Sequence, residues 1–374
     1  MSLSLFVCGD YVNSLGNSNW AGIELRKLIK DVDFSVVNLE APVYTDGMIP
    51  ISKVGPHLYQ SEHAISYLKS VGIDCVTIAN NHIYDYGETA LLNTLNILKE
   101  NNIHVIGGGR DFEEAYSPYI YAKDNIVVGM LGACENEFGC LYEKKDRGGY
   151  AWLFSSYLED AIKLLKFKVD YVVLFAHAGL ENIPFPIKEW RDRYKRLCDL
   201  GVDIIVGHHP HVPQGWEEYN NCYIFYSLGN FYFDTANFAS KSDDSYSVVL
   251  DFSKDNFSFE IITHKKRDLT VEIDDDVDFS VDGLNKLLDF DYDKNNSIIC
   301  HKAYKEYYYS YYQIGVGIAP KNTRFYYKFK SLIKKYFIKR YQDESYQGLM
   351  LLHNIRIDTH RFVVQRALSE LYEE

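Results

Sequence analysis

Three histidines within four residues, His208, His209 and His211, follow a short apolar run at residues 202–206. The run predicts a buried strand, and open α/β sheets place their chemistry at the carboxyl ends of their strands. Imidazole is the commonest protein ligand for transition metals, and it binds them in its neutral form. The loop therefore predicts one wall of a metal site and requires a fold that brings further ligands to it.

Four more apolar runs end in side chains that can bind a metal. These are Asp10 after residues 3–7, Asn38 or Glu40 after residues 34–37, Asn81 and His82 after residues 74–78, and His177 after residues 171–176. Such a donor set suits Mn²⁺, Zn²⁺ or Fe²⁺, and a carboxylate can bridge two ions. The recurrence at successive strand ends predicts a divalent-metal centre, although each histidine alone is also typical of a buried structural histidine.

The apolar runs alternate with helical patterns at residues 22–30, 61–70, 88–100, 155–167 and 187–200. This alternation predicts an α/β domain with a mostly parallel sheet that ends near Lys266. Residues 119–122 with 126–133, and 246–252 with 257–263, are typical of antiparallel pairs at the edge of the sheet.

A change of composition marks residues 267–374, which we expect to form a mainly helical appendage ending in one helix at residues 348–372. Residues 272–293 hold nine acidic side chains, whereas residues 301–340 hold ten lysines or arginines against the single Glu306. The basic, tyrosine-rich stretch is either a solvated helix face or a contact surface for an anionic polymer, a lipid surface or a phosphorylated substrate.

The net charge of −13 disfavours specific binding to nucleic acid. The seven cysteines are scattered without a C-x-x-C pair, which predicts free buried thiols and a reducing compartment. The N-terminus lacks a signal-peptide pattern, and no apolar run reaches the roughly 18 residues that a membrane span needs. We therefore expect a cytoplasmic protein without a transmembrane segment.

Six motifs occur in a characteristic order over roughly residues 3–265. They are Gly9-Asp10, NLE at 38–40, ANNHIYDYG at 79–87, HAG at 177–179, GHHPHVPQG at 207–215 and YSLGNFYFD at 226–234. Together they closely resemble the CapA family of capsule and poly-γ-glutamate synthesis proteins, which is related in fold to the calcineurin-like metallophosphatases. The resemblance implies a four-layer α/β/β/α sandwich in place of a single wound sheet.

The resemblance also implies roles for individual residues. Asp10 and His211 would bind a first metal, Glu40 would bridge, and Asn81, His177 and His209 would bind a second metal. His82 would be the general acid, oriented by Asp85. Glu181 is a candidate base or substrate contact, and the role of His208 stays open, with substrate contact as its candidate use.

The metallophosphatase pattern has aspartate-x-histidine at the position of Asp10. In this chain Tyr11 and Val12 follow Asp10, so the histidine is missing. We therefore expect one or two ions, with Mn²⁺ first and Zn²⁺, Fe²⁺ or Ca²⁺ as alternatives. The implied function is a metal-dependent hydrolase, a phosphoesterase in capsule or surface-polymer biosynthesis that acts on an anionic small molecule or polymer. The alternatives are a metal-dependent peptide- or amide-modifying enzyme (an epimerase or amide hydrolase) and a non-catalytic polymer-binding assembly protein.

Overall fold

The computed structural model describes residues 2–235, 243–318 and 343–373. The chain divides into two compact units. The first unit contains Met1–Ile51 and His57–Phe290, and the second contains Ser52–Pro56 and Asp291–Glu374. The first unit carries every candidate site residue that the sequence suggests.

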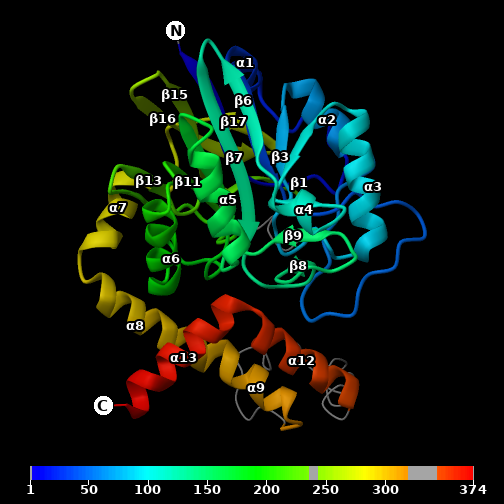
Figure 1. The fold of residues 1–374 in the computed structure, drawn as a ribbon. Coiled ribbons are helices and arrows are strands. Elements are labelled where there is room, and N and C mark those ends of the chain that lie inside the picture. Colours follow the sequence, from blue (N-terminus) through cyan, green and yellow to red (C-terminus); the bar gives the residue numbers. More distant parts are fainter. Residues whose placement is uncertain (1, 236–242, 319–342, 374) are drawn as a thin grey trace. The chain divides into compact units, whose positions relative to one another are not determined.

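Two large sheets and one small sheet form the frame of the first unit (Figure 1). The larger sheet contains β1 (Leu3–Val12), β2 (Phe34–Leu39), β3 (Cys75–Thr77), β4 (His104–Ile106), β14 (Asn230–Phe233), β15 (Ser245–Phe252), β16 (Phe257–Arg267) and β17 (Thr270–Ile273). The second contains β6 (Tyr119–Lys123), β7 (Ile126–Cys134), β10 (Tyr171–His177), β11 (Ile204–His208), β12 (Trp216–Tyr219) and β13 (Cys222–Phe225). The small sheet contains β5 (Gly108–Gly109), β8 (Cys140–Leu141) and β9 (Gly149–Ala151).

Helices pack around the three sheets of the first unit. They are α1 (Ile23–Asp31), α2 (Ala64–Val71), α3 (Gly87–Glu100), α4 (Phe112–Tyr116), α5 (Ser156–Lys166), α6 (Lys188–Asp199) and α7 (Val281–Asp289). Leu25, Leu68 and Leu91, from α1, α2 and α3, pack on the larger sheet, and α5 packs on β7 and β10. A separate core joins the facing sides of the sheets, with Val7 from β1 and Val173 from β10. The expected α/β/β/α sandwich is confirmed.

The order of the strands explains why polar residues gather at one edge. In the larger sheet β1, β2, β3 and β4 are parallel neighbours, and in the second sheet β7, β10, β11 and β13 are parallel neighbours. Their carboxyl ends therefore lie together, which is the position that α/β folds use for ligands. The expected antiparallel pairs are also present, as β6 with β7 and β15 with β16.

The first unit extends beyond Lys266, where the composition suggested a boundary. Strand β16 continues to Arg267, and β17 pairs with it in antiparallel register. Helix α7 then returns to the sheet, where the Asn285 side chain accepts a hydrogen bond of 2.8 Å from the Trp216 backbone in β12. Much of the acidic stretch thus belongs to the first unit. The composition did not predict this, because the pairing of strands along a sheet edge leaves little trace in amino-acid composition.

Apart from the loop Ser52–Pro56, the described part of the second unit is mainly helical. It contains α8 (Tyr292–Ala303), the π-helical turn η1 (Tyr304–Tyr308), α9 (Tyr309–Gly315), α12 (Glu344–Arg356) and α13 (Asp358–Tyr372). The single helix expected at residues 348–372 is wrong, because Ile357 adopts an extended conformation with ψ of 121° and its side chain is buried. Asp358 then begins α13 and pairs with Arg361 one turn later.

The cysteines differ from the expectation of free thiols at two positions. Cys198 at the end of α6 and Cys222 at the start of β13 form a disulfide, with their Cα atoms 5.8 Å apart. The other five cysteines are free and buried, as expected. The pairing depends on a contact between distant segments, which the spacing of cysteines in the sequence does not show.

Candidate metal centre

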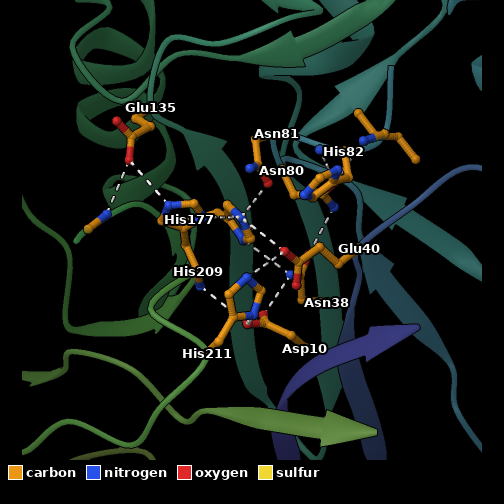
Figure 2. Close-up of polar contacts among 12 residues, drawn as sticks. Asp10, Asn38, Glu40, Asn80, Asn81, His82, Glu135, His177, His209 and His211 are labelled. Atoms are coloured by element: carbon orange, nitrogen blue, oxygen red, sulfur yellow. Dashed lines mark hydrogen bonds and ion pairs between the residues drawn. The ribbon is translucent and has the colours of Figure 1, made fainter. Parts of the chain in front are cut away.

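Strand ends from both sheets bring the candidate ligands into one buried cluster (Figure 2). Asp10 lies near the end of β1, Glu40 directly follows β2, and His177 is the last residue of β10. The pairing register shifts beside Asp10 toward both of its neighbours, β2 and β14. Such bulges redirect side chains next to functional sites, and here the bulge occurs at a candidate ligand.

The cluster contains two groups of residues whose ligand atoms lie within 4.8 Å of one another. One group is Glu40, His177 and His209, and the other is Asp10, Glu40 and His211. Glu40 Oε1 lies 3.8 Å from His177 Nε2 and 3.6 Å from His211 Nε2. Glu40 is the one residue that these two groups share.

Both carboxylate oxygens of Glu40 are buried and have no hydrogen-bond partner within the described chain. Burial, together with the nearby Asp10 carboxylate, raises the pKa of Glu40 well above its ordinary value. Burying a carboxylate without hydrogen bonds is costly, and buried charges are normally paired or coordinate a metal. The residues present therefore fit a divalent cation at this position.

Two histidines of the cluster, His177 and His209, have lowered pKa values that favour the neutral ring. Burial and the neighbouring histidines lower the pKa of His177 well below its ordinary value, and burial lowers the pKa of His209 to about 4. His209 Nδ1 lies 3.2 Å from His177 Nε2, so both rings direct a nitrogen toward the same point. Since metals bind neutral imidazole, neither ring needs to lose a proton at pH 7.

The histidine loop holds its side chains through an unusual backbone. His209 and His211 have positive φ angles of 97° and 59°, which are uncommon for residues other than glycine. The His209 N–H donates a hydrogen bond of 3.3 Å to Asp10 Oδ2, which ties the loop to the other sheet. Such conformations persist where the surroundings enforce them, and they concentrate at functional sites.

The other expected site residues lie at different distances from the cluster. The Asn81 side-chain oxygen is 3.1 Å from His177 Nε2, beside the group that contains His209. His82 is buried, and its Nδ1 atom lies 2.7 Å from Asp85 Oδ2. Glu181 is exposed, yet its charge influences the pKa of both Glu40 and His209. The expected roles of Asn81 as a ligand, His82 as the general acid and Glu181 as a base or substrate contact stay predictions.

The structure does not bring His208 to the centre, contrary to its candidate use as a substrate contact. Its ring is 1% exposed, its Nε2 atom lies 3.1 Å from the Cys8 carbonyl oxygen, and it stacks on Phe175. His208 follows Ile204 and Val206 on the face of β11 that packs between the two sheets. Its position favours packing, because alternate residues of a strand share one face.

Two polar residues near the ligands, Asn80 and Glu135, were not among the expected site residues, and Asn38, expected as the alternative to Glu40, contacts two proposed ligands. Asn38 donates to Asp10 Oδ1 at 2.8 Å, and the same nitrogen lies 3.2 Å from His177 Nδ1. Asn80 donates to the Asn38 side chain. Glu135, fully buried, lies 3.9 Å from His209 Nε2 and accepts a hydrogen bond from the Gly179 backbone. Glu135 directly follows β7, so the same strand-end signal could have found it.

The fold and the centre together define the class of protein. It is an α/β/β/α sandwich with a buried cluster of carboxylates and histidines suited to divalent metals. A family model described as "Bacterial capsule synthesis protein PGA_cap" matches residues 10–235, which is more than half of the chain. The chain therefore belongs to this family, as the resemblance of its motifs indicated.

Named relatives agree with the family assignment. The chain is 32% identical over 211 residues to the "PGA biosynthesis protein CapA" of Bacillus subtilis, covering 56% of each chain. It is 32% identical over 233 residues to the "Capsule biosynthesis protein CapA" of Bacillus anthracis, covering 60% of this chain and 56% of that one. The match thus spans only about half the length of these relatives.

Among solved structures, a 5′-nucleotidase precursor from Thermus thermophilus is similar over 80% of this chain and 60% of its own, with a TM-score of 0.44 and 10% identity. The described residues of the present chain include no helix that is both long and apolar enough to cross a membrane.

Proposed function

We propose that the chain is a divalent-metal-dependent hydrolase that cleaves a phosphoester in the biosynthesis of a capsule or another surface polymer. The proposal depends most on Glu40. Its two buried oxygens have no hydrogen-bond partner among the described residues, and Oε1 lies 3.8 Å from His177 Nε2 and 3.6 Å from His211 Nε2. The family membership and the printed names of the relatives support the link to surface polymers.

Six residues would hold the metals in this proposal: Asp10 and His211 one ion, Asn81, His177 and His209 the other, and Glu40 both. When bound, divalent ions lower the pKa of a coordinated water and neutralise charge on a phosphoryl group. The Asp85 carboxylate fixes the ring of His82, which would donate a proton to the leaving group. Mixed oxygen and imidazole donors suit Mn²⁺ first, with Zn²⁺, Fe²⁺ and Ca²⁺ as alternatives.

A second candidate keeps the metal but replaces the phosphoester with an amide or peptide. Two carboxylates that belong to neither ligand group lie near His209: Glu135 at 3.9 Å and the exposed Glu181. Fixed negative charge disfavours a phosphate dianion and favours a neutral or amine-bearing group. A relative from Mycobacterium tuberculosis is named as a probable polyglutamine synthesis accessory protein, and the synthesis of such a polymer is amide chemistry.

The proposed partner is an anionic small molecule or a surface polymer, without specific binding to nucleic acid. The basic stretch at residues 301–340 stays a candidate surface for anionic polymer or lipid, and its residues 319–340 lie outside the described parts of the chain. The expected cytoplasmic location also stays a prediction.

The test combines metal analysis with substrate panels. Purified protein is loaded with Mn²⁺, Zn²⁺, Fe²⁺ or Ca²⁺ and assayed on phosphate monoesters, phosphate diesters and γ-glutamyl peptides. We expect bound metal and phosphoester cleavage, both lost in Glu40→Ala. The matched control is His264→Gln, because His264 is equally buried but bonds to Ser247 in the sheet.

The other outcomes separate the alternatives. Metal-loaded protein that cleaves γ-glutamyl peptides and leaves phosphoesters intact would establish the second candidate function, a metal-dependent enzyme that acts on amides. Protein that binds polymer equally well as wild type and as His209→Ala, without turnover, would establish a non-catalytic role. Absence of bound metal above trace level would overturn the proposed function.

A further inference from the structure

One ring nitrogen of the proposed ligand His211 contacts the side chain of Asn230 on β14. His211 Nδ1 lies 3.0 Å from the Asn230 side-chain oxygen. Asn230 is the first residue of β14 and is 3% exposed. It pairs in register with Asp10 on β1, so two residues around His211 come from adjacent strands.

The amide of Asn230 continues into a buried ion pair. Its Nδ2 atom donates to Asp243 Oδ1 at 3.5 Å, and the Asp243 carboxylate pairs with the Lys266 ammonium. The side chains of Asp243 and Lys266 are 4% and 9% exposed. Lys266 also donates to the Phe233 carbonyl oxygen at the end of β14. The chain of contacts therefore runs from His211 to β16.

The ion pair determines which way the Asn230 amide faces. An ionised carboxylate only accepts hydrogen bonds, so the NH₂ group of Asn230 must point to Asp243 and its oxygen must point to His211. The His211 atom that meets this oxygen must then be an N–H donor. In a neutral ring, Nε2 is left as the atom with the lone pair, and it lies 3.6 Å from Glu40 Oε1.

Distance alone leaves the choice of nitrogen open, because His211 Nδ1 is also 3.6 Å from Asp10 Oδ2. We propose that Asn230, Asp243 and Lys266 are positioning residues that hold His211 in the Nδ1-protonated form, so that Nε2 is its metal ligand. The consequence for metal binding rests on the proposed function, whereas the tautomer itself can be observed without metal. Outer partners of this kind typically change metal affinity 10- to 100-fold.

The first experiment measures the tautomer in metal-free protein. Long-range ¹H–¹⁵N spectra of ¹⁵N-histidine-labelled chain distinguish the two neutral forms, and His211→Gln assigns the signals. We expect the Nδ1–H form in the wild type and a mixture of forms in Asn230→Ala and Asp243→Ala. A wild-type Nε2–H form, or an unchanged tautomer in both variants, would overturn the proposal.

The second experiment titrates Mn²⁺ and Zn²⁺ into the same variants by calorimetry. We expect Asn230→Ala, Asp243→Ala and Lys266→Met each to weaken binding 10- to 100-fold at one site. The matched control is the adjacent pair Asp244 and Lys265, 3.7 Å apart, because Asp244 is similarly buried but does not contact Asn230 in the described structure.

The outcomes separate this proposal from the proposed function. We call Asn230, Asp243 and Lys266 the relay. If Asp244→Ala weakens metal binding as much as Asp243→Ala, the effect is general destabilisation, and the proposed role of the relay is wrong. If the wild type binds metal and all three relay variants bind it equally well, the relay is also wrong while the hydrolase proposal stands. If the wild type binds no metal, the hydrolase proposal fails, and the tautomer spectra still decide whether the relay orients His211.

Discussion

His82 Nδ1 lies 2.7 Å from Asp85 Oδ2, and both side chains are buried. The same carboxylate oxygen accepts a hydrogen bond of 2.7 Å from the Leu58 backbone. Because the Leu58 backbone N–H holds the Asp85 carboxylate in place, Asp85 fixes both the position of the His82 ring and the proton on its Nδ1 atom. Proton transfer by His82 would then use Nε2.

Asp85→Asn should lower kcat about 10²- to 10⁴-fold, the range for loss of general acid–base catalysis, because the amide no longer fixes the His82 ring. Metal content should stay unchanged, since neither residue belongs to the ligand groups. Steady-state kinetics and elemental analysis measure both. The double variant with His82→Ala should be no slower than His82→Ala alone. Independent, additive effects would show that Asp85 does not act through His82.

Glu40 should make the metal-free protein sensitive to pH. Burial raises its pKa, so the folded chain holds a proton that the unfolded chain releases above the ordinary pKa of 4.5. The free energy of unfolding should therefore fall as the pH rises from 4.5 toward the raised pKa. Glu40→Gln should remove this component and stabilise the metal-free protein at neutral pH, while abolishing the stabilisation by added metal.

Thermal unfolding of chelator-treated protein between pH 5 and 8, with and without Mn²⁺, measures this effect. Glu260→Gln is the control, because Glu260 is exposed on β16 and should leave the pH slope nearly unchanged. Equal pH slopes for the wild type and Glu40→Gln would contradict a buried carboxylate with a raised pKa at this position.

Glu135→Gln should weaken the binding of one metal ion about 10- to 100-fold, because outer carboxylates orient metal-binding histidines. Glu135 lies 3.9 Å from His209 Nε2, on the side of the ring opposite the Nδ1 atom that faces His177. Calorimetric titration with Zn²⁺ measures the affinity, and Glu137→Gln is a neighbouring control. Unchanged affinity in Glu135→Gln would show that His209 keeps its orientation without the carboxylate.

His208→Ala should reduce stability and leave metal affinity nearly unchanged. The ring is buried between the sheets, where its loss removes a hydrogen bond to Cys8 and leaves a cavity. We expect a loss of about 2–4 kcal/mol, typical of large-to-small changes in a core. Chemical denaturation and metal titration measure the two quantities. Loss of metal binding in a variant that is still folded would show that His208 contributes to the metal centre.

The motifs and strand ends of the sequence predicted much of the centre. Asp10, Glu40, His177, His209 and His211 all follow or end apolar runs, and the structure brings them together. Parallel strands make such a prediction possible, because their carboxyl ends share one edge. The bridging geometry of Glu40 came from the resemblance to a family, and the contacts of its side chain agree with it.

Other features depended on contacts that the sequence does not show. The contacts of Asn38 and Asn80 could not be predicted, because a polar residue in the sequence carries no signal of what it faces. Glu135 was missed although it directly follows a strand, where the strand-end signal applies. His208 was grouped with its neighbours in sequence, although the two faces of a strand separate adjacent side chains. The disulfide between Cys198 and Cys222 and the extension past Lys266 likewise depend on pairing between distant segments.

The central claim is that Glu40 bridges divalent metal ions held by residues of both sheets. Crystals soaked in Mn²⁺ or Zn²⁺ and measured at the metal absorption edge test it most directly. We expect anomalous peaks beside the Glu40 carboxylate, two of them about 3.5–4 Å apart when both metal positions are filled. An anomalous map without a peak at Glu40, from crystals that take up metal elsewhere, would contradict it.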